Sequence, residues 1–322
     1  MSIRRDEAIS VPVPAVPDDR ASRSLHWRRT TSNEPRGFIQ PHALDELWFH
    51  TGTACNLACP FCLEGSKPGD NRLQMMRFDE VTPFVDEALE LGVKQFSFTG
   101  GEPFVNKDII SILDYALMHR PCLVLTNATS PLIKRLKQLE PLRNRPCALN
   151  FRVSLDYSDA ARHDAGRGAG MFDLALEGLR ELLEMGFHVS VANQFLPGIA
   201  PNVISANFVD VFRAAGLPDD LPRVEFPEFH PPAARVKPPQ ITERCMTDFH
   251  TEETRRRFMC AFSKMIAKSD GRMHVYACTL VDDDPDYILG KTLTEAMQAS
   301  VSMKHHRCYS CFKYGASCSE LK

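Results

Sequence analysis

The stretch "TACNLACPFC" at residues 53–62 places three cysteines, Cys55, Cys59 and Cys62, on one short segment. It follows the run "ELWFHTG" at 46–52, whose apolar and aromatic residues predict a strand. The three thiols are therefore expected on a loop at the C-terminal end of a strand, where α/β folds keep their chemistry. What three thiolates without a local fourth can bind depends on the rest of the chain.

Composition limits the classes of protein to which this chain can belong. Its 322 residues are 43% hydrophobic and carry a formal net charge of −3, which suits one large α/β domain with a small appendage. No long basic block is present, so we expect no nucleic acid partner. The N-terminus lacks a signal peptide's apolar stretch and no apolar run has transmembrane length, so we expect a cytoplasmic protein that does not bind membranes.

Strand and helix patterns alternate from residue 43 onward. Strands are predicted at 46–52, 93–98, 122–127, 147–156, 187–195 and 223–229, and helices at 81–92, 108–119, 132–140, 172–186 and 203–216. Repeated βα units imply a parallel sheet, and six of them can curl into a partial (β/α)6 barrel.

The barrel is expected to span residues 41–235, and the segments before and after it in the sequence differ from it in composition. Residues 1–40 are rich in Pro, Arg, Ser and Asp, and predict a mobile tail. A Pro-rich stretch, "HPPAARVKPP", precedes a Cys-rich domain at 236–322. That domain is weakly periodic, so we expect a metal to hold it together where a core cannot.

Eleven cysteines, an odd number, argue against a disulfide framework in a protein without secretion signals. Five of them form a C-terminal group that contains a CxxC pair: Cys260, Cys278, Cys308, Cys311 and Cys318. Zinc and iron–sulfur are both compatible with that spacing. The other three, Cys122, Cys147 and Cys245, are expected to be small buried hydrophobic residues.

The three-cysteine loop has two structural interpretations, a zinc site completed by a distant residue and three reduced cysteines. Its catalytic interpretation is different, because a missing fourth ligand leaves one metal open to an outside molecule. The spacing C-x3-C-x2-C, with Phe61 before the last cysteine, resembles the radical S-adenosylmethionine (SAM) superfamily. The resemblance implies a [4Fe–4S] cluster on three thiolates, with SAM bound to its fourth iron and cleaved by one electron to methionine and a 5′-deoxyadenosyl radical.

Further stretches between about residues 45 and 230 carry the same resemblance. "TGGEP" at 99–103, with Gly100, Gly101, Glu102 and Pro103, resembles the family's contact with the methionine amino group. Ser154 matches a ribose contact, and Arg167 matches the residue that pairs with the SAM carboxylate, a task suited to a guanidinium. Asn127 ends the third strand, where relatives often carry a segment that faces SAM. The equal alternative is that Asn127 only forms a turn.

The C-terminal cysteines, with "SDGRMHVYAC" and "YILG", resemble the SPASM and twitch extensions of radical SAM enzymes. The smaller twitch form implies one auxiliary [4Fe–4S] cluster with four ligands from the five candidates, and we expect Cys318 to be the spare. An aspartate that serves as general base in sulfatase-maturating relatives is replaced here by Thr279. The nearby Asp282, Asp283 and Asp284 are expected to form a solvated acidic turn.

Three functions follow from these features. The first is a radical SAM enzyme that oxidises or rearranges a small molecule, and the second is the same chemistry on a peptide. The N-terminal tail is shorter than the peptide-recognition domain of many peptide maturases, which weakens the second. A non-catalytic iron–sulfur or zinc protein is the third. For an enzyme, the resemblance also implies a flavodoxin or ferredoxin as reductant.

Overall fold

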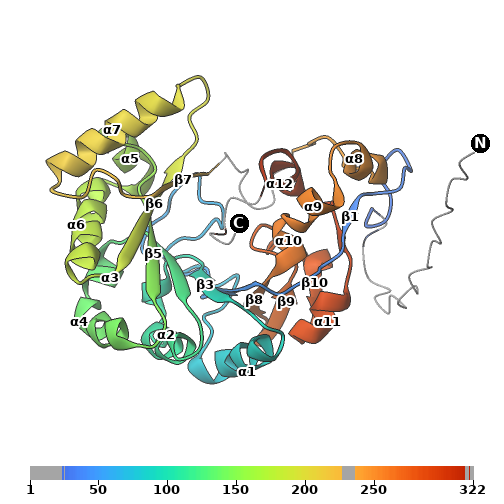
Figure 1. The fold of residues 1–322 in the computed structure, drawn as a ribbon, viewed down its shortest axis with the longest axis horizontal. Coiled ribbons are helices and arrows are strands. Elements are labelled where there is room, and N and C mark those ends of the chain that lie inside the picture. Colours follow the sequence, from blue (N-terminus) through green and yellow to red (C-terminus); the bar gives the residue numbers. More distant parts are fainter. Residues whose placement is uncertain (1–23, 25, 227–235, 316–318, 320–322) are drawn as a thin grey trace, which may run out of the picture.

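The computed structural model describes residues 24, 26–226, 236–315 and 319. A curved nine-stranded sheet in the order β10-β9-β8-β2-β3-β4-β5-β6-β7 forms its centre (Figure 1). The six consecutive parallel strands are β2 (Glu46–His50), β3 (Gln95–Thr99), β4 (Cys122–Thr126), β5 (Leu149–Ser154), β6 (His188–Gln194) and β7 (Arg223–Phe226). Within the described residues β7 and β10 are free edges, so this is an open partial barrel, as predicted.

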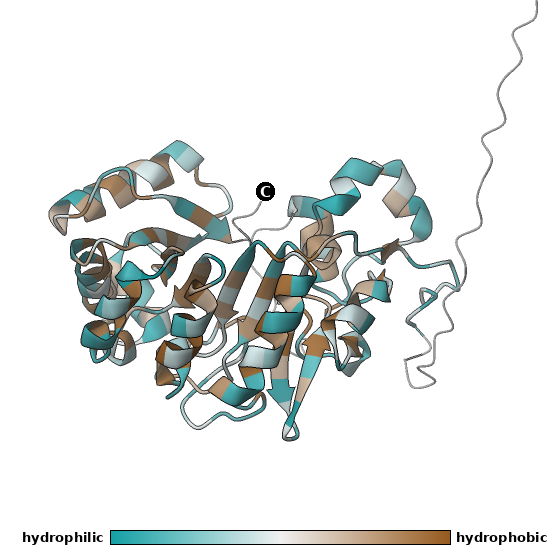
Figure 2. Ribbon diagram, turned by 60° about the horizontal axis from the view of Figure 1, so that its bottom comes forward, coloured by the Kyte–Doolittle hydropathy of each residue, from teal (hydrophilic) through white to brown (hydrophobic). Residues whose placement is uncertain are grey.

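Helices cover the outer, convex face of this sheet (Figure 1). They are α1 (Phe78–Glu90), η1 (Pro103–Val105), α2 (Ile109–Leu117), α3 (Ser130–Ile133), α4 (Leu136–Leu139), η2 (Glu140–Asn144), α5 (Ala160–Arg167), α6 (Met171–Glu184) and α7 (Pro201–Ala214). Figure 2 shows apolar segments along strands and hydrophilic residues on outer helix turns. In α1, for example, Val81, Val85 and Ala88 are buried, as the helical spacing predicts.

Two helices differ from the prediction. The helix expected over 132–140 is divided into α3 and α4, because Arg135 leaves the helical backbone region. Helix α5 was not expected at all. Its N-cap signal is Asp159, whose carboxylate accepts a hydrogen bond from the Arg162 amide at 2.7 Å.

The C-terminal region continues the same sheet. Strand β8 (Ser263–Ser269) pairs in parallel with β2, and β9 (Arg272–Tyr276) and β10 (Ile288–Gly290) follow antiparallel. A turn at Asp270 and Gly271 connects β8 to β9. Met265 and Ile266 are fully buried in one core cluster with Trp48 and Phe49. The expectation that only a metal could hold this region together is therefore wrong, because β8 gives it a share of the barrel's core.

Short elements complete the C-terminal region. They are α8 (Glu243–Asp248), α9 (Glu252–Arg256), α10 (Met259–Phe262), η3 (Pro285–Tyr287), α11 (Leu293–Gln298), β11 (Val301–Ser302) and α12 (Cys308–Tyr314). No helix in the described ranges is long and apolar enough to cross a membrane.

Part of the predicted N-terminal tail is folded. Strand β1 (Phe38–Ile39) pairs antiparallel with β11, and lies beside the C-terminal elements in Figure 1. Trp27 is 3% exposed and its ring contacts that of Tyr287 at 5.0 Å, edge to face. Residues 26–40 are thus not a mobile tail, because an indole and a short strand tie them to the body. Residues 1–23 and 25, and the expected domain boundary at 235, lie outside the described residues.

Candidate active site

The cysteine loop leaves β2 and is fixed to the loop that leaves β3. The amides of Gly101 and Glu102 donate to the carbonyls of Gly52 and Ala54, at 2.8 and 3.2 Å. A Cβ on Gly101 would lie 2.3 Å from the Ala54 oxygen, and Gly100 has a φ of +136°. Two glycines are needed because the backbones touch. In this structure they allow the backbone at 100–101 to approach the cysteine loop closely.

Cys55, Cys59 and Cys62 are half-buried and close enough to influence one another electrostatically. Burial raises the pKa of all three thiols, that of Cys55 to about 11. Without a metal they are therefore neutral thiols, and binding an iron–sulfur cluster would release their protons. Three sulfur donors on one loop, with no fourth on it, fit a cluster that keeps one iron open.

Glu102 is bonded to this loop through its backbone amide and is 2% exposed. Its carboxylate accepts hydrogen bonds from the Phe104 amide at 3.1 Å, the Thr126 hydroxyl at 2.9 Å and the Asn127 amide at 2.8 Å. Burial raises its pKa to about 7, although these hydrogen bonds oppose the shift. In this structure Glu102 joins the loops after β3 and β4, which is a positioning task.

Asn127 forms a turn, one of the two alternatives from the sequence, and its side chain also contacts the cysteine loop. Its side-chain oxygen accepts a hydrogen bond from the Thr129 amide at 3.1 Å, which forms a turn. Its amide group donates to Asn56 at 3.0 Å and lies 3.9 Å from the Cys55 sulfur. Ser154 is half-buried at the end of β5. The ends of β2, β4 and β5 thus bring predicted site residues to one edge of the sheet.

Arg167, at the end of α5, is engaged by a carboxylate of the chain itself. Its Nε and Nη2 donate to the two oxygens of Asp156, the second at 3.0 Å. The Asp156 carboxylate, with help from the cysteines, raises the pKa of Arg167 despite burial. Phe61 packs on Gly166, where a Cβ would lie 2.2 Å from its ring, and beneath the Arg167 guanidinium at 5.8 Å. The Arg167 side chain is therefore held beside the cysteine loop.

The C-terminal cysteines form a second group. Cys260, Cys278 and Cys311 are each 7% exposed, and Cys308 is half-buried. Burial raises the pKa of Cys260, Cys278 and Cys308, and the neighbouring cysteines raise the pKa of Cys260 and Cys278 further. Cys308 and Cys311 lie three residues apart on α12, so they share a helix face. Four thiols in a closed setting fit a fully ligated cluster. Cys318 lies outside the described residues. Of the three scattered cysteines, Cys122 is buried as expected, whereas Cys147 and Cys245 are half-buried.

Lys264 is a residue of this second group that sequence reasoning missed. It is fully buried, and its ammonium donates to the carbonyls of Cys260 and Ser263, both at 2.8 Å. Burial lowers its pKa to about 8, while Cys260 and Cys278 oppose the shift. The signal in the sequence was a lysine directly before the apolar run at 265–267.

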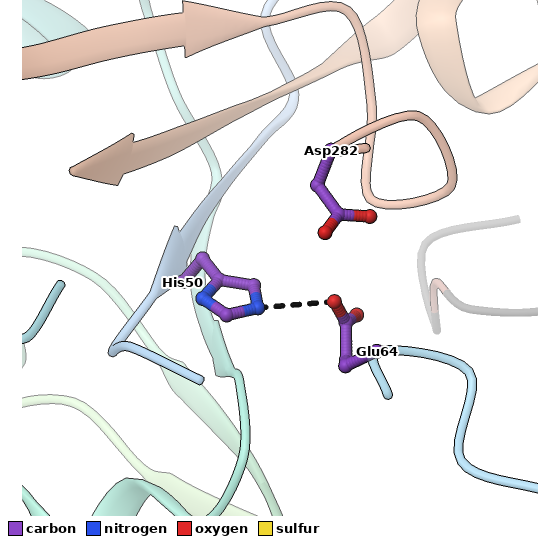
Figure 3. A group of neighbouring side chains, drawn as sticks. All are labelled: His50, Glu64 and Asp282. Atoms are coloured by element: carbon purple, nitrogen blue, oxygen red, sulfur yellow. Dashed lines mark hydrogen bonds and ion pairs between the residues drawn. The ribbon is translucent and has the colours of Figure 1, made fainter. Parts of the chain in front are cut away.

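Sequence reasoning also missed a buried group of His50, Glu64 and Asp282, whose ligand atoms lie within 4.8 Å of one another (Figure 3). His50 Nε2 and Glu64 Oε2 are 3.0 Å apart. Asp282 is 3% exposed, so the expectation of a solvated acidic turn is wrong for this residue. Burial, together with the Glu64 charge, raises the pKa of Asp282 to about 7. Only folding shows this group, because Asp282 lies more than 200 residues after His50 and Glu64 in the sequence.

Comparison with known proteins agrees with this arrangement. The model of the radical SAM superfamily matches residues 49–200. Over 134 residues the chain is 31% identical to the mycofactocin maturase MftC of Mycolicibacterium smegmatis, covering 42% of this chain and 33% of MftC. It is 25% identical over 171 residues to the GTP 3′,8-cyclase of Petrotoga mobilis, covering 52% of each.

A solved structure of Streptococcus suis SuiB bound to S-adenosylmethionine superposes with a TM-score of 0.56. The match covers 77% of this chain and 62% of SuiB, at 14% sequence identity, so it shows a common fold. The chain spans about a third of the length of MftC (33%) and about half of the length of the GTP 3′,8-cyclase (52%).

Proposed function

The chain belongs to the radical SAM superfamily, and we propose that it cleaves SAM reductively and abstracts a hydrogen atom from a substrate. The observation that carries this proposal is the cysteine loop. Three half-buried thiols lie at the C-terminal end of β2, beside the Gly100–Gly101 turn and Asn127. A structural metal site needs a complete set of ligands, whereas three thiols leave room for an outside molecule.

Cys55, Cys59 and Cys62 would hold the [4Fe–4S] cluster. When bound, the cluster supplies the electron that cleaves SAM to methionine and the 5′-deoxyadenosyl radical. By the family resemblance, the 100–103 backbone receives the methionine amino group and Ser154 the ribose. Arg167 would receive the SAM carboxylate. Because its guanidinium also donates to Asp156, its N–H groups must then serve both carboxylates.

Cys260, Cys278, Cys308 and Cys311 would hold an auxiliary [4Fe–4S] cluster. Their burial supports a closed site, and Lys264 would place a positive charge beside the thiolates. The number of thiols in the described part of this group is enough for complete ligation. Cys318 stays a fifth candidate.

Two substrate classes have support. A peptide is supported by the relatives, because MftC is a maturase and SuiB has also been solved bound to its precursor peptide SuiA. A small molecule is supported by the likeness to GTP 3′,8-cyclase, which matches a larger share of both chains. A flavodoxin or ferredoxin would supply the electron in either case.

The activity is tested by anaerobic reconstitution with iron and sulfide, followed by reduction with dithionite in the presence of SAM. We expect 5′-deoxyadenosine from the natural sequence and from Cys147→Ala, a matched control outside both cysteine groups. Cys59→Ala should give none. A chain that binds iron at the loop but yields no 5′-deoxyadenosine would contradict the proposal.

The substrate class is tested by comparing extracts of cells with and without the gene. Mass spectrometry of small metabolites and of short peptides should show one compound that accumulates when the gene is deleted. Whether that compound is a peptide or a small molecule decides between the two classes.

A further inference from the structure

Two consecutive carbonyl groups just after Cys62 are held by arginines. The Leu63 oxygen accepts a hydrogen bond from Arg307 Nη2 at 2.7 Å, and the Glu64 oxygen accepts one from Arg72 Nη2 at 3.0 Å. Arg307 is 1% exposed, whereas Arg72 is partly exposed. Charged donors make stronger hydrogen bonds than neutral ones, so these contacts restrain the C-terminal end of the cysteine loop.

Both arginines meet at Asp282. Arg72 Nη2 lies 2.9 Å from Asp282 Oδ2, and Arg307 Nη1 lies 3.6 Å from Asp282 Oδ1. Arg307 also donates to the Leu280 carbonyl at 3.3 Å and directly precedes Cys308 in the sequence. One buried carboxylate from the C-terminal region is therefore connected, through two guanidinium groups, to the peptide units that follow Cys62.

A metal ion is the competing explanation for this group, since His50, Glu64 and Asp282 offer a nitrogen and two carboxylates (Figure 3). The charges argue against it. Arg72 and Arg307 already supply two positive charges for the two carboxylates. A divalent cation would leave a net positive charge in a buried place, which is costly. The group is therefore an ion-pair network.

We propose that Asp282 is a positioning residue for the cysteine loop. Through Arg72 and Arg307 it fixes the peptide units of Leu63 and Glu64, and so the direction of the neighbouring Cys62 thiol. The C-terminal region thereby shapes the SAM-binding centre as well as its own. The effect on the cluster rests on the proposed function, whereas the effect on the loop backbone does not.

The test compares Asp282→Asn with Asp284→Asn in the full chain. Both changes remove one carboxylate from the same acidic turn, but Asp284 pairs with Lys304 at 2.7 Å. In the metal-free chain, hydrogen exchange is measured for amides 62–66, among which the Gly65 amide bonds to the Cys62 carbonyl at 3.1 Å. We expect about tenfold faster exchange in Asp282→Asn, the factor for losing about one charge-assisted hydrogen bond, and no change in Asp284→Asn.

A second measurement uses the reconstituted chain. A chelator should remove iron from the cysteine loop faster in Asp282→Asn than in Asp284→Asn. The loss of this iron is monitored by the effect of SAM on the electron paramagnetic resonance signal. If Asp282→Asn does not fold, Arg307→Lys takes its place, because one ammonium cannot serve both the Leu63 and Leu280 carbonyls.

The outcomes separate the two proposals. Equal exchange of amides 62–66 in the Asp282 and Asp284 variants overturns the positioning role, whatever the iron content. If the natural sequence binds no iron at the loop, the proposed function fails, but faster exchange in Asp282→Asn still supports the positioning of the loop.

Discussion

The two cysteine groups differ in what surrounds them. Cys55, Cys59 and Cys62 are half-buried on a loop whose backbone is held by hydrogen bonds to the neighbouring loop. The C-terminal thiols lie on or beside core elements, and three of the four are 7% exposed. The two groups of thiols thus differ in how accessible they are to an outside molecule. The open one suits a site where an outside molecule binds, and the closed one suits a site whose metal is fully ligated.

The charges around the two groups differ as well. Beside the open group, Arg167 is paired with Asp156, so its charge is largely balanced. Beside the closed group, Lys264 donates to two carbonyls and is fully buried. A buried ammonium gains from negative charge nearby, which four thiolates on a cluster would provide.

Removing the open group should have the largest effect. The variant with Cys55, Cys59 and Cys62 all changed to alanine should produce no 5′-deoxyadenosine, yet keep roughly half of its iron if both clusters hold four irons. Iron and sulfide per chain, measured anaerobically, check this. Loss of all iron would mean that the closed group holds no cluster of its own.

Removing part of the closed group should leave the fold in place. Cys308→Ala with Cys311→Ala should lose roughly half of the iron, but β8 stays paired with β2 in the shared core. Limited proteolysis should therefore cleave near α12 and spare residues 263–290, while SAM cleavage without substrate continues. Cleavage throughout 241–302 would show instead that the metal holds this region together.

A smaller effect is expected at the SAM carboxylate. If Arg167 holds the SAM carboxylate as proposed, Arg167→Lys should weaken SAM binding by about 1–3 kcal/mol, because one ammonium cannot serve both Asp156 and SAM. Equilibrium binding to the reconstituted chain measures this. Arg162→Lys is the control, since Arg162 is exposed on the same helix, over the Tyr157 ring at 4.0 Å. Equal affinities in the two variants would remove Arg167 from the SAM site.

The last effect concerns the pH dependence of stability and Glu102, which supports the open group. Its pKa of about 7, raised by burial from the usual 4.5, means that the folded chain keeps a proton that the unfolded chain releases. Stability should therefore fall as pH rises from about 4.5 to about 7, by at most about 1.4 kcal/mol per pH unit. Urea unfolding between pH 5 and 8 should show a flatter profile for Glu102→Gln than for the exposed-residue control Glu90→Gln. Identical profiles would contradict the shift.

Local patterns predicted the open group and the barrel around it. The cysteine spacing and the strands at 46–52 and 93–98 are continuous in sequence, and each reports its own structure. Helix α5 was missed because its sequence has few apolar residues. Its N-cap at Asp159 was the only local signal for it. The folded part of the N-terminal segment was missed because Trp27 is buried by a ring from the distant Tyr287.

The sequence by itself determined the three-thiol loop, the alternation of strands and helices, and the resemblance to the radical SAM superfamily, since these depend on neighbouring residues and regular spacing. Only the tertiary structure decided that β8 joins the sheet beside β2, and that Asp282 is buried between two arginines. It also decided that Arg167 pairs with Asp156. Strand pairing and ion pairing join residues across long stretches of chain, and their energies depend on burial, which spacing along the sequence does not specify.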